Sequence, residues 1–352
     1  MLLLLRTDSQ LGSEGTDRKV IESSGGRESI WEPGGPTEPL VSVETLISAI
    51  KPEDVETFRP LLPVGYRNVA EAYKRSLNDL SAEYLTSHYT SGQEWFREIF
   101  TPYIKNTLSD LSGNEWNFDQ YDSFAAGSDV DFMTHIVNTK SATEKVALYP
   151  GDWYGFIVGA SFQENIKFTL DSRGKMACLC VPSVRNGQLS GEMYDFLDRA
   201  DSCLLNINLY PTMSAEERFK IAQSLKPFLE KSIISISFSR GFGLTASQLG
   251  IILVHPNNPL RRKYDQQWNW FTYFYNSIAA KAFMNIDIAQ LQKVDDMRRN
   301  WVFNWLENNS FPVVESGTYY VKSFRVKGEI PEYLKILCRN DLLRLCFKPQ
   351  IF

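Results

Sequence analysis

The spacing of apolar and polar positions changes along the chain and divides it into regions. Residues 6–39 are polar and rich in Gly, Ser and Glu, so they predict a flexible or extended arm rather than a core element. From residue 40 onwards apolar residues recur at helical spacing. This spacing predicts helices over 43–50, 70–86 and 93–111.

After Asn117 the pattern changes to short apolar runs that alternate with amphipathic segments. Strands are predicted at 121–125, 145–149, 176–181, 202–209, 233–238 and 250–255. Helices are predicted between them at 129–138, 154–160, 190–200 and 215–230. Such alternation is typical of βαβ units, and it predicts an α/β fold with a mostly parallel central sheet.

The C-terminal part of the chain has a different pattern. Residues 265–308 form a long, aromatic-rich helical region, and strands at 317–326 and 342–347 flank a helix at 331–338. We therefore expect a small α+β domain here. The predicted organisation is an arm over 1–39, a large domain over 40–262, and a long helix with the small domain over 263–352.

Composition narrows the function classes. The 352 residues are 43% hydrophobic, 22% charged and 13% aromatic, and the formal net charge is only -5 with both signs mixed along the chain. This composition predicts a packed protein without the basic patch that nucleic-acid binding requires. The initial apolar run, Met1–Leu5, is too short for a signal peptide, and no later run is long enough to span a membrane.

Cysteine and histidine usage points to a reducing compartment and to no metal site. The five cysteines are an odd number and lie in apolar stretches, which favours free thiols in the cytoplasm. Cys178 and Cys180 would share one face of a strand, where packing is favoured over metal binding. The three histidines are scattered without metal-ligand spacing.

The sharpest motif is the segment ISFSRGFGLTASQLGIILV at 236–254. It resembles the cofactor turn of fold-type-I, class I/II aminotransferases, which depend on pyridoxal phosphate (PLP). In that family a lysine in this turn forms a Schiff base with PLP, because the reaction needs a neutral amine. Here the matching residue is Arg240, whose guanidinium stays protonated and cannot form an imine. The resemblance covers roughly residues 85–350, and it implies the family's large domain and small C-terminal domain.

Other positions can be matched to the family in order along the chain. Gly127 and Ser128 match its phosphate cup at a helix N-terminus, and Trp153 or Tyr154 matches the aromatic residue that stacks on the cofactor ring. Val181 stands before Pro182 where the family has an asparagine.

The matches continue towards the C-terminus. Asn206 or Asn208 takes the place of the aspartate that holds the pyridine nitrogen, and Tyr210 matches the phenol beside the ring oxygen. Ser237 matches a second phosphate-binding serine, but Gln248 replaces the phosphate arginine. Arg344 resembles the arginine that grips a substrate carboxylate, and Arg185 is a further candidate cation.

Each match also has a simpler explanation. Gly127 and Ser128 can be an ordinary helix N-cap, Trp153 core packing, and Arg185 a solvated loop charge. Arg240 can be a surface turn residue and Arg344 an exposed strand residue whose charge reaches solvent. It is the order of the matches along the chain that favours a shared site.

The resemblance leads to two hypotheses. The first is a divergent aminotransferase-fold enzyme of amino-acid or specialised metabolism that forms no internal aldimine. It would bind a carboxylate- or phosphate-bearing metabolite through Arg240, Arg185 and Arg344, and any PLP or pyridoxamine phosphate reversibly. The second is a catalytically silent, aminotransferase-like subunit with a structural or regulatory role. Both imply a dimer, since fold-type-I sites lie at a subunit interface. A homodimer is expected, and the silent subunit can also pair with an active relative. An active enzyme with its lysine elsewhere is disfavoured, because Lys226 and Lys231 belong to the preceding helix and its connection.

Overall fold

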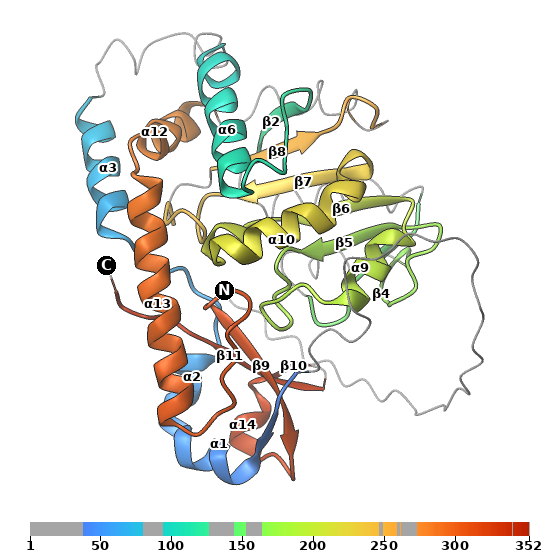
Figure 1. Cartoon of the computed structure of the whole chain (residues 1–352), viewed down its shortest axis with the longest axis vertical. Helices are drawn as coiled ribbons and strands as arrows, with labels where there is room; N and C mark the ends of the chain where they lie inside the picture. The colour runs from blue at the N-terminus through green and yellow to red at the C-terminus, as the bar shows by residue number, and fades with distance from the viewer. Residues whose placement is uncertain are drawn as a thin grey trace. The chain divides into compact units, whose positions relative to one another are not determined.

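The computed structural model describes residues 38–79, 94–126, 144–152, 164–245, 249–258, 261, 273–339 and 341–351. All of them belong to one compact unit, residues 33–352. Two sheets organise this unit (Figure 1). Among the described residues, no helix is long and apolar enough to cross a membrane.

The larger sheet has seven strands in the order β2-β8-β7-β6-β5-β3-β4. They are β2 (Asp122–Ala126), β3 (Val146–Leu148), β4 (Ile166–Phe168), β5 (Met176–Cys180), β6 (Ser202–Asn206), β7 (Ser232–Ser237) and β8 (Gly250–Val254). The five strands from β7 to β4 run parallel, and β8 runs antiparallel to both of its neighbours. The strands β3, β5, β7 and β8 are buried along their whole length, which explains their continuous apolar runs.

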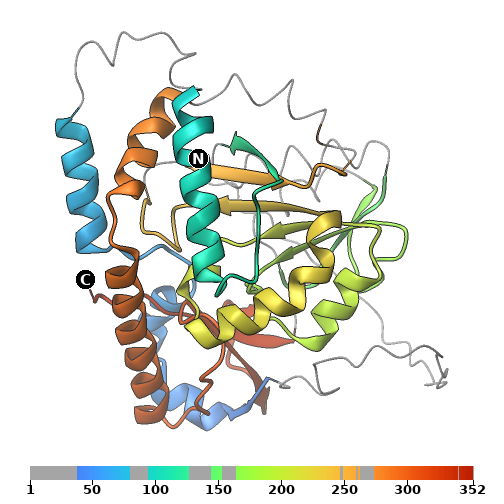
Figure 2. The ribbon, with the colours of Figure 1, turned by 45° about the horizontal axis from the view of Figure 1, so that its top comes forward.

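Helices α6 (Thr101–Leu111), α9 (Gly191–Asp198) and α10 (Ala215–Leu225) lie on one side of this sheet (Figures 1 and 2). Helix α10 begins at Ser214, whose side chain accepts the backbone N–H of Glu217, as an N-cap residue does. The turn η4 (Lys226–Lys231) then leads into β7. The connection from β6 to α10 contains the short turn η3 (Tyr210–Thr212).

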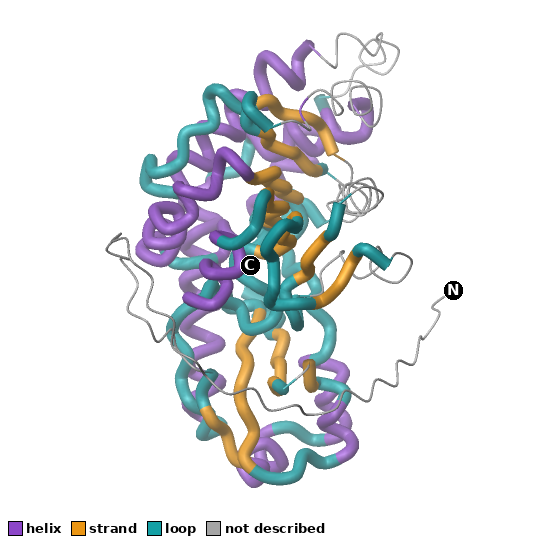
Figure 3. The backbone as a smooth tube through the Cα atoms, turned by 90° about the vertical axis from the view of Figure 1, so that its right-hand side faces the viewer, coloured by secondary structure: helices purple, strands orange, loops and turns teal. Residues whose placement is uncertain are grey.

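The smaller sheet has the order β1-β9-β11-β10. It consists of β1 (Leu40–Ser42), β9 (Val321–Lys327), β10 (Cys338–Arg339) and β11 (Leu342–Cys346), and only β1 and β9 pair in parallel. The first described strand therefore pairs with the C-terminal part of the chain. Around this sheet lie α1 (Val43–Ala49), η1 (Pro52–Asp54), α2 (Val55–Phe58), α14 (Glu332–Lys335) and the long helix α13 (Ile288–Asn308), as Figure 3 shows from the side. Helix α3 (Arg67–Asn78) packs on α12 (Tyr273–Met284), and η2 (Phe96–Phe100) precedes α6.

The predicted α/β fold with a mostly parallel sheet and a small α+β part is confirmed. Three details differ. The strand predicted to reach residue 209 ends at Asn206, because the Asn206 side chain accepts the N–H of Asn208 and turns the chain. The helix predicted at 331–338 is a single turn, and the strands β1, β4 and β10 were not predicted. The helices predicted at 129–138 and 154–160 lie outside the described residues, and the domain boundaries stay a prediction.

A buried polar network ties α13 to three other segments. One carboxylate oxygen of Asp295 accepts the hydroxyls of Tyr66 and Tyr319 at 2.7 and 2.9 Å and lies 3.5 Å from the Arg298 guanidinium. Arg298 stacks over the Tyr66 ring and donates to the carbonyl of Ile351 near the C-terminus. The network therefore fixes the segment before α3 against the start of β9 and the end of the chain.

The other oxygen of Asp295, Oδ2, is buried and has no hydrogen-bond partner among the described residues. Burial raises the pKa of Asp295 from 3.8 to about 6, against the opposing effect of the two tyrosine hydroxyls and of Arg298. A carboxyl group whose folded-state pKa is raised binds its proton more tightly in the folded state. Its contribution to stability is present below the unfolded pKa and is lost as the pH rises through the folded value.

We therefore expect the melting temperature of the wild type, relative to that of Asp295→Asn, to fall as the pH rises from about 4 to about 6. Above about pH 7 the difference should stay constant, because the carboxyl group is then ionised in both states. Thermal unfolding of both proteins by circular dichroism measures this difference. The contributions of groups that titrate in both proteins cancel when the two melting temperatures are subtracted. A difference that is flat from pH 4 to 6, or that grows, would contradict the prediction.

Candidate functional site

The turn after β7 carries Arg240 to the carboxyl edge of the parallel strands. Gly241 comes so close to the end of β6 that a Cβ there would lie 2.7 Å from the carbonyl oxygen of Asn208. Gly243 has a φ of +73°, and a Cβ there would lie 2.4 Å from the ring of Tyr66. The Gly-Phe-Gly sequence thus lets the turn pack between β6 and Tyr66.

Arg240 lines a small cavity at this edge. The other lining residues are Cys180, Pro182, Val184, Asn206, Asn208 and Leu209, and the volume is about 10 Å³. A cavity of this size holds about one water molecule. The guanidinium of Arg240 donates to the carbonyl of Leu61 at 3.1 Å. The structure therefore brings the residue in the lysine position to the ends of β5 and β6.

Two other predicted residues meet at this edge. The amide oxygen of Asn208 accepts the backbone N–H of Ser237 at 2.6 Å, which joins the ends of β6 and β7. The hydroxyl of Ser237 lies 2.8 Å from that of Ser239 in the same turn. Both Asn208 and Ser237 are buried. Asn206 and Asn208 both line the cavity, and the side chain of Asn208 bonds the end of β7.

Arg344 reaches the site from the smaller sheet. It lies on β11 with only 2% of its surface exposed, and it donates to the carbonyl of Val184 at 3.2 Å. Opposite it on β9, Ser323 donates to the carbonyl of Arg185. This face of the smaller sheet is thus directed at the loop that follows β5. Burial lowers the pKa of Arg344, and the charge of Asp152 opposes that effect.

Asp152 is a buried residue of the site that the sequence motif did not single out. It follows β3 and accepts three hydrogen bonds, from Cys180 N at 2.5 Å, Ser183 Oγ at 3.1 Å and Val184 N at 2.9 Å. The only signal in the sequence was a carboxylate after a Pro-Gly turn at the end of a predicted strand. Burial raises the pKa of Asp152 to about 6, opposed by these hydrogen bonds.

Two predicted residues do not meet in the cavity. The hydroxyl of Tyr210 donates to the carbonyl of Arg218 at 2.9 Å, and its ring stacks on Trp116 beneath α10. Arg185 is in the loop after β5, but its guanidinium forms a 2.8 Å ion pair with Asp341. Their proposed roles remain predictions. Gly127, Ser128, Trp153 and Tyr154 lie outside the described residues.

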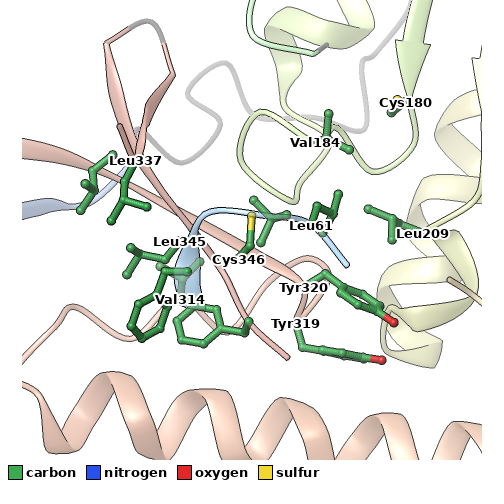
Figure 4. Close-up of a cluster of buried hydrophobic side chains, with 14 of the residues drawn as sticks. Leu61, Cys180, Val184, Leu209, Val314, Tyr319, Tyr320, Leu337, Leu345 and Cys346 are labelled. Carbon is green, nitrogen blue, oxygen red and sulfur yellow. The ribbon is translucent and has the colours of Figure 1, made fainter. Parts of the chain in front are cut away.

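Leu61 fills the space between the two sheets beside this site. Figure 4 shows it between Val184 and Leu209 on one side and Cys346 on the other. A hydrogen bond fixes the chain three residues after Leu61, because Val64 donates its N–H to the hydroxyl of Tyr320 at 3.0 Å. No group of three or more possible metal ligands occurs in the part of the chain that the structure describes.

The chain is similar in structure to solved aminotransferases and C-S lyases. The chain matches the histidinol-phosphate aminotransferase from Clostridium acetobutylicum with a TM-score of 0.57 and 12% identity, over 83% of this chain and 93% of that one. It matches the PLP-bound C-S lyase from Staphylococcus hominis with a TM-score of 0.59 and 12% identity, over 86% and 91%. It matches an aminotransferase from Staphylococcus aureus with a TM-score of 0.58 and 12% identity, over 89% of this chain and 90% of that one.

This chain has the PLP-dependent aminotransferase fold. No protein-family model matches its sequence, and no curated protein matches it either. At 12–14% identity the likeness to the solved structures is one of fold alone. The function therefore has to be argued from the residues of the site.

The close approach of the Arg240 turn to Tyr66 can be tested with a matched pair of glycines. Gly174→Ala places an alanine in the left-handed region at φ +65°, where its Cβ has nothing within 4 Å. It should lower the free energy of unfolding by about 1 kcal/mol. Gly243→Ala, at φ +73°, adds a clash with the Tyr66 ring and should cost a further 1–3 kcal/mol, roughly. Urea unfolding of the two variants measures the difference. Equal costs would mean that Tyr66 moves aside freely.

Proposed function

We propose that this protein is a divergent aminotransferase-fold enzyme that binds an anionic, amino-acid-like metabolite and forms no internal aldimine. The observation that carries the proposal is Arg240 at the end of β7, facing the cavity at the carboxyl edge of the sheet. No lysine is among the described residues that line this cavity. A guanidinium cannot attack the cofactor aldehyde, since it stays protonated at physiological pH.

The neighbouring residues also fit covalent PLP chemistry poorly. PLP, when bound to an enzyme of this fold, supplies an electron sink that depends on a protonated ring nitrogen. Asn208 offers an uncharged amide here, and its oxygen already accepts the N–H of Ser237. We therefore derive no reaction step through the cofactor. We propose that PLP or pyridoxamine phosphate, where it binds, is held reversibly.

The charges favour an anionic ligand. Arg240 and Arg344 reach the site from opposite sheets, and both stand within electrostatic range of Cys346, as do Arg339 and Lys348. Asp152 is a carboxylate beside this site, and it already accepts three hydrogen bonds from Cys180, Ser183 and Val184. We propose that Arg344 and Arg240 bind the acidic groups of the metabolite. Their present acceptors are backbone carbonyls, which a carboxylate would replace as the stronger acceptor.

A catalytically silent subunit is the second candidate. The tight packing around Arg240 favours it, because the part of the cavity lined by described residues measures about 10 Å³ and Leu61 closes its side. The two candidates differ in ligand binding. An enzyme must open to admit its substrate, whereas a silent subunit need not. We propose a cytoplasmic homodimer in either case, and the five free cysteines are compatible with a reducing compartment.

The absence of an imine can be tested directly. Wild-type protein incubated with PLP and reduced with borohydride should show no covalent adduct at this site when the labelled peptides are mapped by mass spectrometry, because Arg240 offers no neutral amine. Arg240→Lys is the matched variant, since it presents an amine from the same backbone position and should form the adduct. An adduct on the wild type, mapped to any lysine in this site, would contradict the proposal.

The anion site can be tested with sulfate, which remains a dianion from pH 5 to 8. Arg344→Gln should weaken sulfate binding at least about tenfold, because hydrogen bonds to charged groups contribute roughly 1.5–3 kcal/mol. Arg325→Gln is the control: it removes an arginine from β9 of the same sheet that is 54% exposed and 3.9 Å from Glu38, whereas Arg344 is buried and donates to Val184, which lines the cavity. Calorimetry measures both affinities. Equal losses in the two variants would argue against a specific site, and no binding to the wild type would favour the silent subunit.

A further inference from the structure

The loop that follows β5 forms one wall of the proposed anion site, and a single buried side chain holds it. Cys180, Pro182 and Val184 of this loop line the cavity with Arg240. Asp152 reaches the loop from the end of β3, on the neighbouring strand. Its two carboxylate oxygens accept the N–H of Cys180, the hydroxyl of Ser183 and the N–H of Val184. The course of the loop is therefore set by the Asp152 carboxylate.

The same loop residue connects Asp152 to the arginine of the smaller sheet. Val184 donates its N–H to Asp152 at 2.9 Å and accepts a hydrogen bond from Arg344 at 3.2 Å through its carbonyl. Displacing Val184, which lines the cavity, would therefore move an acceptor of the Arg344 guanidinium. Arg344 is 2% exposed, so its position depends on the few polar groups around it.

The hydrogen bonds around Asp152 require a carboxylate. The side chain is completely buried, and its two oxygens accept the N–H groups of both Cys180 and Val184, which a neutral amide with a single acceptor oxygen could not do. Arg344 is a buried cation that donates to the same loop. Burial lowers the pKa of Arg344, and the charges of Cys346 and of Asp152 oppose that effect. The charge of Asp152 thus favours the protonated form of Arg344.

We propose that Asp152 is the positioning residue of the anion site: it fixes the wall formed by Cys180–Val184 and, through Val184 and its own charge, holds Arg344 toward the ligand. This inference rests on the proposed function, because it assumes that Arg344 binds an acidic group. It assigns Asp152 no contact with the ligand. Its effect on the ligand passes through the loop and through Arg344.

The experiment uses the full chain and sulfate as the probe. Asp152→Asn keeps the shape of the side chain but removes its charge, and it should weaken sulfate binding about tenfold or more by calorimetry while circular dichroism shows a folded protein. Asp171→Asn is the matched control, since Asp171 is an exposed aspartate that caps a turn after β4 by accepting the N–H of Arg173. That variant should bind sulfate as the wild type does. Wild-type affinity in Asp152→Asn would overturn the proposal.

A pH profile separates positioning from simple loss of structure. The groups that face Asp152 are Arg344 from β11 and the Cys178 thiol from β5, whose pKa burial raises well above its usual range. Neither titrates between pH 5 and 7, whereas the pKa of Asp152 is raised to about 6. Sulfate affinity of the wild type should rise as the pH passes upward through this value, because the ionised carboxylate holds the loop and Arg344. Asp152→Asn should lose this rise, and any pH dependence that remains, such as that of Asp295 with its pKa of about 6, should be common to both proteins.

The remaining outcomes are also decisive. A wild-type affinity that falls through this pH interval would mean that Asp152 acts only by repelling the anion, which overturns the proposal. If Asp152→Asn does not fold, Ser183→Ala removes one of the three donors, and unchanged sulfate affinity in that variant would overturn it. If sulfate binds and requires Arg344 but is indifferent to residue 152, the proposed anion site stands and only the role of Asp152 fails. If sulfate does not bind the wild type, the anion site itself fails.

Discussion

The burial of the parallel strands on both faces constrains everything else in this molecule. Strands such as β5 and β7 are buried along their whole length, and the larger polar side chains of the site lie where the strands end. At the carboxyl edge these ends are cross-connected by side chains, with Asn208 bound to the β7 turn and Asp152 bound to the loop after β5. The site is the consequence of that crowding of polar groups at one edge.

The smaller sheet matters because it brings a buried cation to this edge. Arg344 and Ser323 share one face of that sheet and both donate to carbonyls of the loop after β5. The network around Asp295 holds α13, the start of β9 and the segment before α3 together, and that segment carries Leu61 to Arg240. The positions of Arg240 and Arg344 thus depend on contacts made far from the cavity.

The proposed function depends on the chemistry of residue 240. An arginine keeps its charge when it is partly buried and directs several donors to acceptors, whereas a lysine in such a place can become a neutral nucleophile. Arg240 lines the same cavity as the uncharged Asn208. These two residues support the proposal of a ligand that supplies negative charge.

The sequence by itself determined the order of most elements and the mostly parallel sheet, because short apolar runs such as 176–180 that alternate with amphipathic segments are typical of βαβ units with strands buried on both faces. It also placed Arg240, Asn208 and Ser237 at strand ends, since strand ends follow from the same pattern. Only the tertiary structure decided the rest. Tyr210 turned under α10 onto Trp116, Arg185 paired with Asp341, β1 joined a strand almost three hundred residues away, and Asp152 reached across to the next strand. Side-chain direction and long-range pairing depend on which surfaces meet in space, and local spacing carries no record of that.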